Sequence, residues 1–187
     1  MLIEHTVNAI ATELKRVEET IERRIGWNGD PAVFGMFGDP TDTTAHAEVL
    51  PFEPNWTVPL PGRSGNVPVP IVLRALADQL NTNPPAWLSG WVRRNAGPLL
   101  GAAFLCEGWV TSGFAGYRYG DLNAVPAMAD AEARILIAVD TDGRLYQLIR
   151  RRGEQPTLAV EIEPTRRQRD ATVVDAVYRL THAFRAV

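Results

Sequence analysis

The sequence is poor in cysteine and in long hydrophobic runs. Its single cysteine, Cys106, excludes an internal disulfide, and a thiol within an apolar run is more often a small buried hydrophobe than a nucleophile. The longest apolar runs fall far short of the ~20 residues that a membrane-spanning helix needs. Residues 1–24 also lack the uninterrupted apolar stretch of a secretory leader. We therefore expect a cytoplasmic protein without a membrane partner.

The sequence also lacks a large excess of positive or of negative charge. The net charge is -3, and Lys15 is the only lysine among 19 basic residues. Such a chain is not drawn as a whole to nucleic acid or to anionic lipid. With 45% hydrophobic and 22% charged residues, its 187 residues suit one globular unit. We expect a single domain over residues 1–187.

The hydrophobic period predicts helices at both ends and in the middle of the chain. Apolar residues recur at spacings of three and four from Ile3 to Ile21, which is the helical period. Gly26 follows the last turn and favours an end near Arg24. Further helices are predicted over 70–80, over 87–92 and over 173–184, the last with Asp170 or Thr172 as its N-cap.

Strand signals occupy most of the remaining chain. Asp142-Gly143 is a strong hairpin signal between two strand-like runs. The predicted strands are 32–37, 99–110, 133–140, 144–151 and 157–163, with edge strands near 47–52 and 56–60 in the proline-rich segment 38–70 and a glycine-rich excursion over 111–130. This order predicts an α+β fold. We expect a mostly antiparallel sheet with N-terminal, central and C-terminal helices packed largely on one face.

One acidic segment holds the chain's candidate acid/base and metal ligands. Asp39, Asp42, His46 and Glu48 fall together after the first predicted strand, and such groups supply oxygen and nitrogen ligands or an acid/base pair. Turn chemistry alone also explains the run from 38 to 42. The other histidines, His5 and His182, lack metal-ligand spacing, and we expect surface or packing roles. No catalytic residue, metal or cofactor is assigned.

A further set of charged residues lies on the predicted strands. Glu107, inside an apolar strand, is expected to be partly buried, with a raised pKa or an arginine partner. Arg150, Arg151 and Arg152, followed by arginines at 166, 167 and 169, could meet phosphate or an acidic protein surface. Strand alternation sends Arg150 and Arg151 to opposite faces, which dilutes this patch.

Tryptophan is the last notable residue type. Of the five tryptophans, Trp87 and Trp91 lie one turn apart on a short predicted helix beside the proline-rich loop. Tryptophan favours both cores and binding hot spots. The pair predicts an exposed apolar groove, with core packing as the alternative.

A family resemblance rests on turns and core positions. The residues that carry it are 22–37 with Gly26-Trp27 and Asp30-Pro31, Ala103-Phe104 with Glu107 and Trp109, and 140–144 with Arg150. These stretches resemble small uncharacterised proteins of actinobacteria and their phages. The element order is also similar to the type III secretion chaperone-like fold, whose members bind unfolded or extended segments of partner proteins. The resemblance implies no catalytic residue.

Three functions remain open on the sequence. The leading hypothesis is a non-enzymatic protein-binding or chaperone-like accessory domain that binds a protein partner and self-associates, as a homodimer or larger homo-oligomer. Its contact residues would be Trp87 and Trp91, with Arg150, Arg151 and Arg152 as further binding candidates. The first alternative is a small metal-dependent or hydrolytic enzyme that uses the segment from Asp39 to Glu48. The second is phosphate or nucleic-acid binding through the C-terminal arginines, although we expect no nucleic-acid partner.

Overall fold

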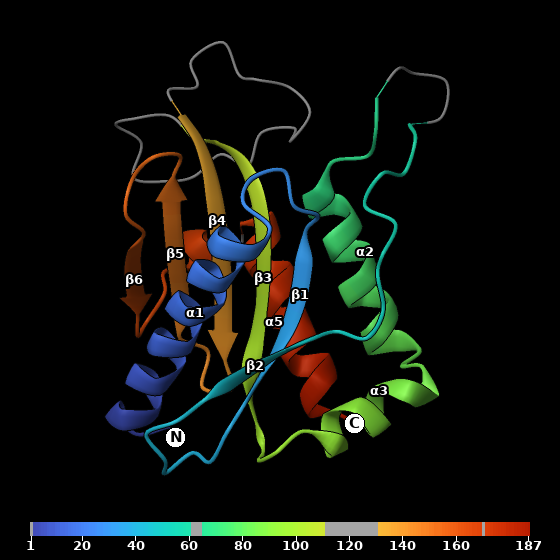
Figure 1. Cartoon of the computed structure of the whole chain (residues 1–187). Coiled ribbons are helices and arrows are strands. Elements are labelled where there is room, and N and C mark those ends of the chain that lie inside the picture. The colour runs from blue at the N-terminus through green and yellow to red at the C-terminus, as the bar shows by residue number, and fades with distance from the viewer. Residues whose placement is uncertain (1, 61–64, 111–130, 170) are drawn as a thin grey trace.

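A six-stranded antiparallel sheet forms the middle layer of the protein, with helices on both faces (Figure 1). The computed structural model describes residues 2–60, 65–110, 131–169 and 171–187. The excursion predicted over 111–130, the candidate cap Asp170 and the side chain of Trp109 lie outside the described part. In the order of the chain, the elements are α1 (Glu4–Arg24), β1 (Ala32–Phe37), β2 (His46–Val49), α2 (Val69–Thr82), α3 (Ala86–Arg94), β3 (Leu99–Val110), β4 (Ala131–Asp140), β5 (Leu145–Arg151), β6 (Thr157–Glu161), α4 (Arg166–Arg169) and α5 (Thr172–Arg185).

The α+β class and the antiparallel sheet are confirmed. The strand order is β2-β1-β3-β4-β5-β6, so the apolar run of β3 lies inside the sheet. The predicted hairpin joins β4 to β5, and Gly143 takes the positive φ of +85° that its turn requires. The edge strand expected over 56–60 is wrong, since only an isolated bridge joins Pro59 to Asn66. The segment is too rich in proline to supply the N–H groups of a ladder.

The two faces of the sheet carry separate hydrophobic cores. On one face α2, α3 and α5 cover Phe104, Ile135 and Ile137 with their own apolar residues. On the other face α1 packs against Leu105 and Leu136. Most of the helices thus lie on one face, as expected, with α1 across the opposite side (Figure 1). Alternation along the strands therefore divides each strand between two cores.

Helix α1 meets the sheet with a narrow apolar stripe. Ile10, Leu14 and Val17 are buried at the helical period. Unlike α5, which buries a broad apolar face, α1 also buries the acidic residues Glu13 and Glu18. Burying carboxylates requires partners on the sheet. Within the described residues, no helix is long and apolar enough to cross a lipid bilayer.

Strands β3 and β4 approach one another most closely at Gly101. A Cβ at this position would overlap the backbone carbonyl of Val139 and lie 2.9 Å from the Cα of Asp140. Both obstacles are backbone atoms in the middle of the sheet, so neither can move away without breaking the β3–β4 ladder. Glycine is therefore required at this point.

We expect Gly101→Ala to destabilise the fold by about 1–3 kcal/mol, because overpacking forces the backbone apart. Gly90→Ala is the matched control. Gly90 lies inside α3 with no atom within 4 Å of an added Cβ, so alanine there should stabilise by roughly 0.5–1 kcal/mol. Urea unfolding of the three proteins measures both effects. Equal stabilities would contradict the close approach at Gly101.

Candidate functional site

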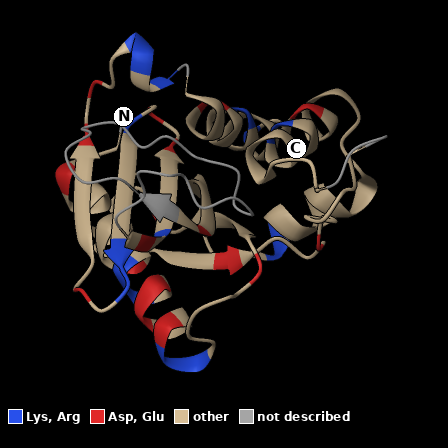
Figure 2. Ribbon diagram, turned by 90° about the horizontal axis from the view of Figure 1, so that it is seen from above, with Lys and Arg blue, Asp and Glu red and all other residues tan. Residues whose placement is uncertain are grey.

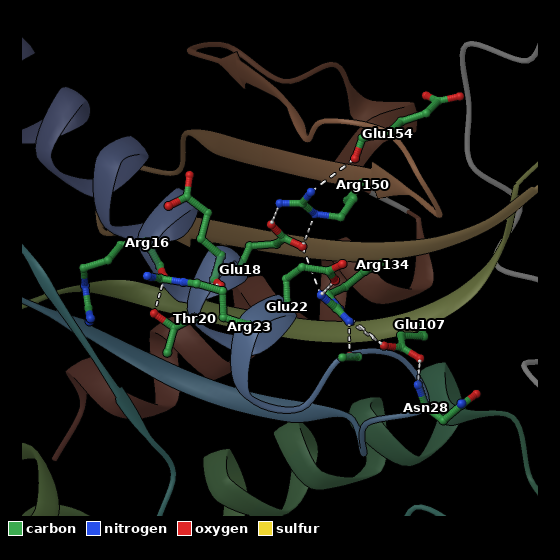
Figure 3. A network of polar contacts seen from close by, with 12 residues as sticks. Arg16, Glu18, Thr20, Glu22, Arg23, Asn28, Glu107, Arg134, Arg150 and Glu154 are labelled. Carbon is green, nitrogen blue, oxygen red and sulfur yellow. Dashed lines mark hydrogen bonds and ion pairs between the residues drawn. The ribbon is translucent and has the colours of Figure 1, made fainter.

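The most polar buried site of the described chain centres on Arg134, in β4, on the face that α1 covers (Figure 3). The Arg134 side chain is 0% exposed. Its guanidinium lies 3.1 Å from a Glu18 oxygen, 2.8 Å from Glu22 and 3.0 Å from Glu107. It also donates to the backbone oxygen of Gly26, just after α1. One arginine thus joins α1, the turn that follows it and β3.

Glu18 binds a second arginine. Its carboxylate, which is 0% exposed, accepts hydrogen bonds from Nε and Nη2 of Arg150 at 2.7 Å each. This paired geometry is the strong form of a charge-assisted hydrogen bond. The hydrogen bonds and charge of Glu18 raise the pKa of Arg150. Glu18 therefore lies between the arginines of two neighbouring strands.

The turn after α1 closes the network. The backbone N–H of Asn28 donates to Glu107 at 2.7 Å, and Asn28 itself holds the positive φ of +72°. The ring of Trp27 lies 4.8 Å from the guanidinium carbon of Arg134 and 5.4 Å from that of Arg152. These are cation-π distances. The turn is therefore fixed by both polar and aromatic contacts.

The charged groups of the network lie in contact with one another. Three carboxylates, Glu18, Glu22 and Glu107, meet two arginines. In the described part of the chain, every buried side-chain nitrogen and oxygen has a hydrogen-bond partner. A fully satisfied buried network rigidifies a fold. We interpret this network as one that holds α1 and the turn after it against the sheet.

The arginine partner expected for Glu107 is confirmed, whereas Glu18 and Arg134 were not recognised as site residues. Glu18 looked like one more polar residue on the solvent face of an amphipathic helix. The register of the folded sheet reveals them: it pairs Arg134 directly with Arg150, while Glu107 faces Arg134 from β3. Two like charges opposite each other destabilise a sheet, and here the carboxylates of Glu107 and Glu18 offset that repulsion.

The arginines of the C-terminal quarter do not form one surface. Arg150 is buried against Glu18, and Arg151 is half-buried. Arg152 is 56% exposed and pairs with Glu132 at 2.5 Å. Figure 2 shows Lys and Arg at separate places around the molecule, interspersed with Asp and Glu. Binding of phosphate by a continuous patch of Arg150, Arg151 and Arg152 therefore finds no support in this arrangement.

The acidic segment around β2 is organised by turns. Thr41 donates to Asp39 and lowers the pKa of that carboxyl, and hydrogen bonds from Thr44 and Thr43 lower the pKa of Asp42. His46 stacks on Phe37 with ring centroids 5.7 Å apart. Among the described residues, no group of three or more His, Cys, Asp or Glu side chains is placed to hold a metal ion.

The other histidines are placed as expected. His5 is exposed on α1, and the Nδ1 of His182 lies 2.9 Å from the side-chain oxygen of Asn81. This contact joins α5 to the end of α2. Both are therefore surface residues.

The tryptophans of α3 separate into a core residue and a surface residue. Trp91 is 6% exposed and makes edge contacts with Phe37 and Phe184, at centroid distances of 5.5 and 5.3 Å. Trp91 thus follows the core-packing alternative and does not line an exposed groove. Trp87, one turn earlier, is half-buried and stacks on Phe52 at 6.2 Å. Phe52, which was not singled out in the sequence, is 47% exposed.

The segment that carries Phe52 is held on both sides. The N–H of Leu50 donates to Val33 in β1 at 2.8 Å, and the Leu50 side chain is buried. Trp56 lies against Phe104 of β3, with centroids 5.7 Å apart. An aromatic pair, Phe52 with Trp87, is thus presented at the rim of the larger core.

The chain matches no known protein family model, and no curated protein or solved structure is significantly similar to it. Its site is therefore judged on geometry alone.

We expect Arg134→Met to destabilise the protein by about 3–5 kcal/mol, because it leaves Glu18 and Glu107 as buried carboxylates with fewer partners. Arg152→Met is the control at an exposed ion pair with Glu132 and should cost at most about 1 kcal/mol. Urea unfolding monitored by circular dichroism measures both. Equal losses would show that the Arg134 network does not hold the fold.

Cys106 offers a probe of opening of the larger core. It is buried, and desolvation together with the nearby charge of Glu107 raises its thiol pKa to about 12. Because the thiolate is the reactive form, we expect a disulfide reagent at neutral pH to label it only as fast as the domain opens. Rapid labelling of the native protein, at the rate of the urea-unfolded chain, would contradict this burial.

Proposed function

We propose that the protein is a protein-binding accessory domain, chaperone-like in that it holds an apolar segment of a partner protein. The observation that carries the proposal is the aromatic pair of Phe52 and Trp87, stacked at the surface of the domain. Aromatic side chains dominate the binding energy of protein interfaces.

The arrangement of the pair favours binding in a second way. Leu50 and Trp56 fix the segment on either side of Phe52, and Trp87 is fixed by α3. A partner would therefore meet rings whose positions are already set. Preorganisation lowers the entropy cost of association, since fewer side chains have to be ordered on binding.

Charged residues accompany the pair along the chain. Arg93 and Arg94 are exposed in the last turn of α3, and Glu53 is exposed next to Phe52. A hydrophobic centre with a polar rim is the usual anatomy of a protein interface. We therefore propose a partner segment with large apolar side chains and flanking polar residues.

The proposal is tested by affinity capture from the native host with three baits: wild type, Phe52→Ala/Trp87→Ala, and Ile25→Ala. Ile25 is 63% exposed at the end of α1, far from the pair in the sequence, and serves as the matched apolar control. We expect a protein retained by wild type and by Ile25→Ala, and reduced at least tenfold on the aromatic double variant.

All three baits are first compared by circular dichroism and thermal unfolding, so that only folded proteins are used. A prey that binds the double variant as well as it binds wild type would refute the role of the pair. The absence of any specific prey on wild type would refute the proposed function.

A further inference from the structure

Helix α3 carries a glycine that no contact within the described residues explains. Gly90 lies in the interior of the helix, where glycine is less stable than alanine because it has more backbone freedom to lose. A Cβ added at Gly90 would meet no atom of the surrounding chain within 4 Å, so packing does not require glycine there. Glycine also allows a second backbone to approach a helix closely. The open space at Gly90 is therefore suited to a partner chain that passes over α3.

Gly90 shares one flank of α3 with Trp87 and Arg94. The three residues stand at positions i, i+3 and i+7, which fall on one side of an α-helix. This α3 flank lies beside the buried Trp91, at the border between core and solvent, with Trp87 half-buried and Arg94 exposed. Because Trp87 stacks on Phe52, the α3 flank continues from the aromatic pair.

Arg94 gives the α3 flank a positive charge at the end away from the aromatic pair. Its guanidinium forms no ion pair with any described residue, and α3 contains no acidic residue. Arg93, in the same turn, donates to the backbone oxygen of Ser89 and adds a second positive charge. The exposed Glu53 follows Phe52 in the chain, at the aromatic end. An unpaired cation next to an apolar contact is complementary to a carboxylate on the partner.

We infer that the partner is an extended acidic segment that lies along the α3 flank, with a large apolar side chain at Phe52 and Trp87 and a carboxylate at Arg94. This inference rests on the proposed function and adds the chemistry of the bound segment. The seven positions from Trp87 to Arg94 span roughly 10 Å of helix axis. An extended chain covers that distance in about three residues, so the segment carries Asp or Glu about three positions from its apolar anchor. Its backbone passes over Gly90.

The test uses a phage-displayed library of random linear peptides as the probe, selected in parallel on three folded proteins: wild type, Arg93→Glu/Arg94→Glu and Arg23→Glu/Arg24→Glu. Arg23 and Arg24 are the exposed last residues of α1, as Arg93 and Arg94 are of α3, and they lie at a distant helix end (Figure 1). Wild type and the α1 variant should select large apolar residues with Asp or Glu about three positions away. The α3 variant should select Lys or Arg there, because the charge of its flank is reversed.

A peptide selected on wild type is then synthesised, and its Kd is measured by fluorescence polarisation. Gly90→Ala should raise this Kd about tenfold, because the added methyl group occupies the space of the peptide backbone. The same variant should unfold at no lower urea concentration than wild type. A weaker complex from a protein of undiminished stability separates a binding role of Gly90 from a structural one. The Phe52→Ala/Trp87→Ala protein should not bind the peptide.

The outcomes separate this inference from the proposed function. Peptides that require Phe52 and Trp87 but show no preference for acidic residues, or the same preference on the Arg93→Glu/Arg94→Glu protein, overturn the inference and leave the aromatic pair in place. So does a Kd that Gly90→Ala leaves unchanged. If wild type selects no peptide, or only peptides that bind the aromatic double variant equally well, the proposed function fails and the inference fails with it.

Discussion

The fold depends on the burial of one charged side chain, that of Arg134. Arg134 is buried at the interface between α1 and the sheet, and a buried charge costs several kcal/mol unless its partners replace water. Those partners come from α1, from the turn after it and from β3, and Glu18 adds Arg150 of β5. Each of these elements must therefore hold its position for the others to be satisfied.

A second polar cluster anchors the start of α1. Asp140, which is buried, accepts the hydroxyl of Tyr146 at 2.9 Å and the backbone N–H of Arg144 at 3.0 Å. Arg144 in turn donates to the backbone oxygen of Leu2 at 3.0 Å, and desolvation raises the pKa of Tyr146. The apolar stripe of α1 thus lies between two polar anchors, which fix where the helix sits along the hairpin of β4 and β5.

The face of the sheet opposite α1 is held together in a different way. Apolar packing of α2, α3 and α5 holds it together, and its aromatic residues extend from the core at Trp91 to the surface at Phe52. The ion pairs on the face that α1 covers are thus suited to selecting one arrangement of the helix and the strands. The apolar face reaches the surface at its rim, where Phe52 stacks on Trp87.

The sequence by itself determined most of the elements and the class of the fold. The spacing from Ile3 to Ile21, the apolar run of β3 and the turn at Asp142-Gly143 are local patterns, and the helix and the strands form where they predicted. Tertiary structure decided which residue of a similar pair is buried. Trp91 lies in the core while Trp87 reaches Phe52, and Glu18 is buried while the adjacent Glu19 remains exposed. Local spacing fixes the face of a helix, but the partners of that face come from elements distant in the sequence, as Arg134 and Arg150 do for Glu18.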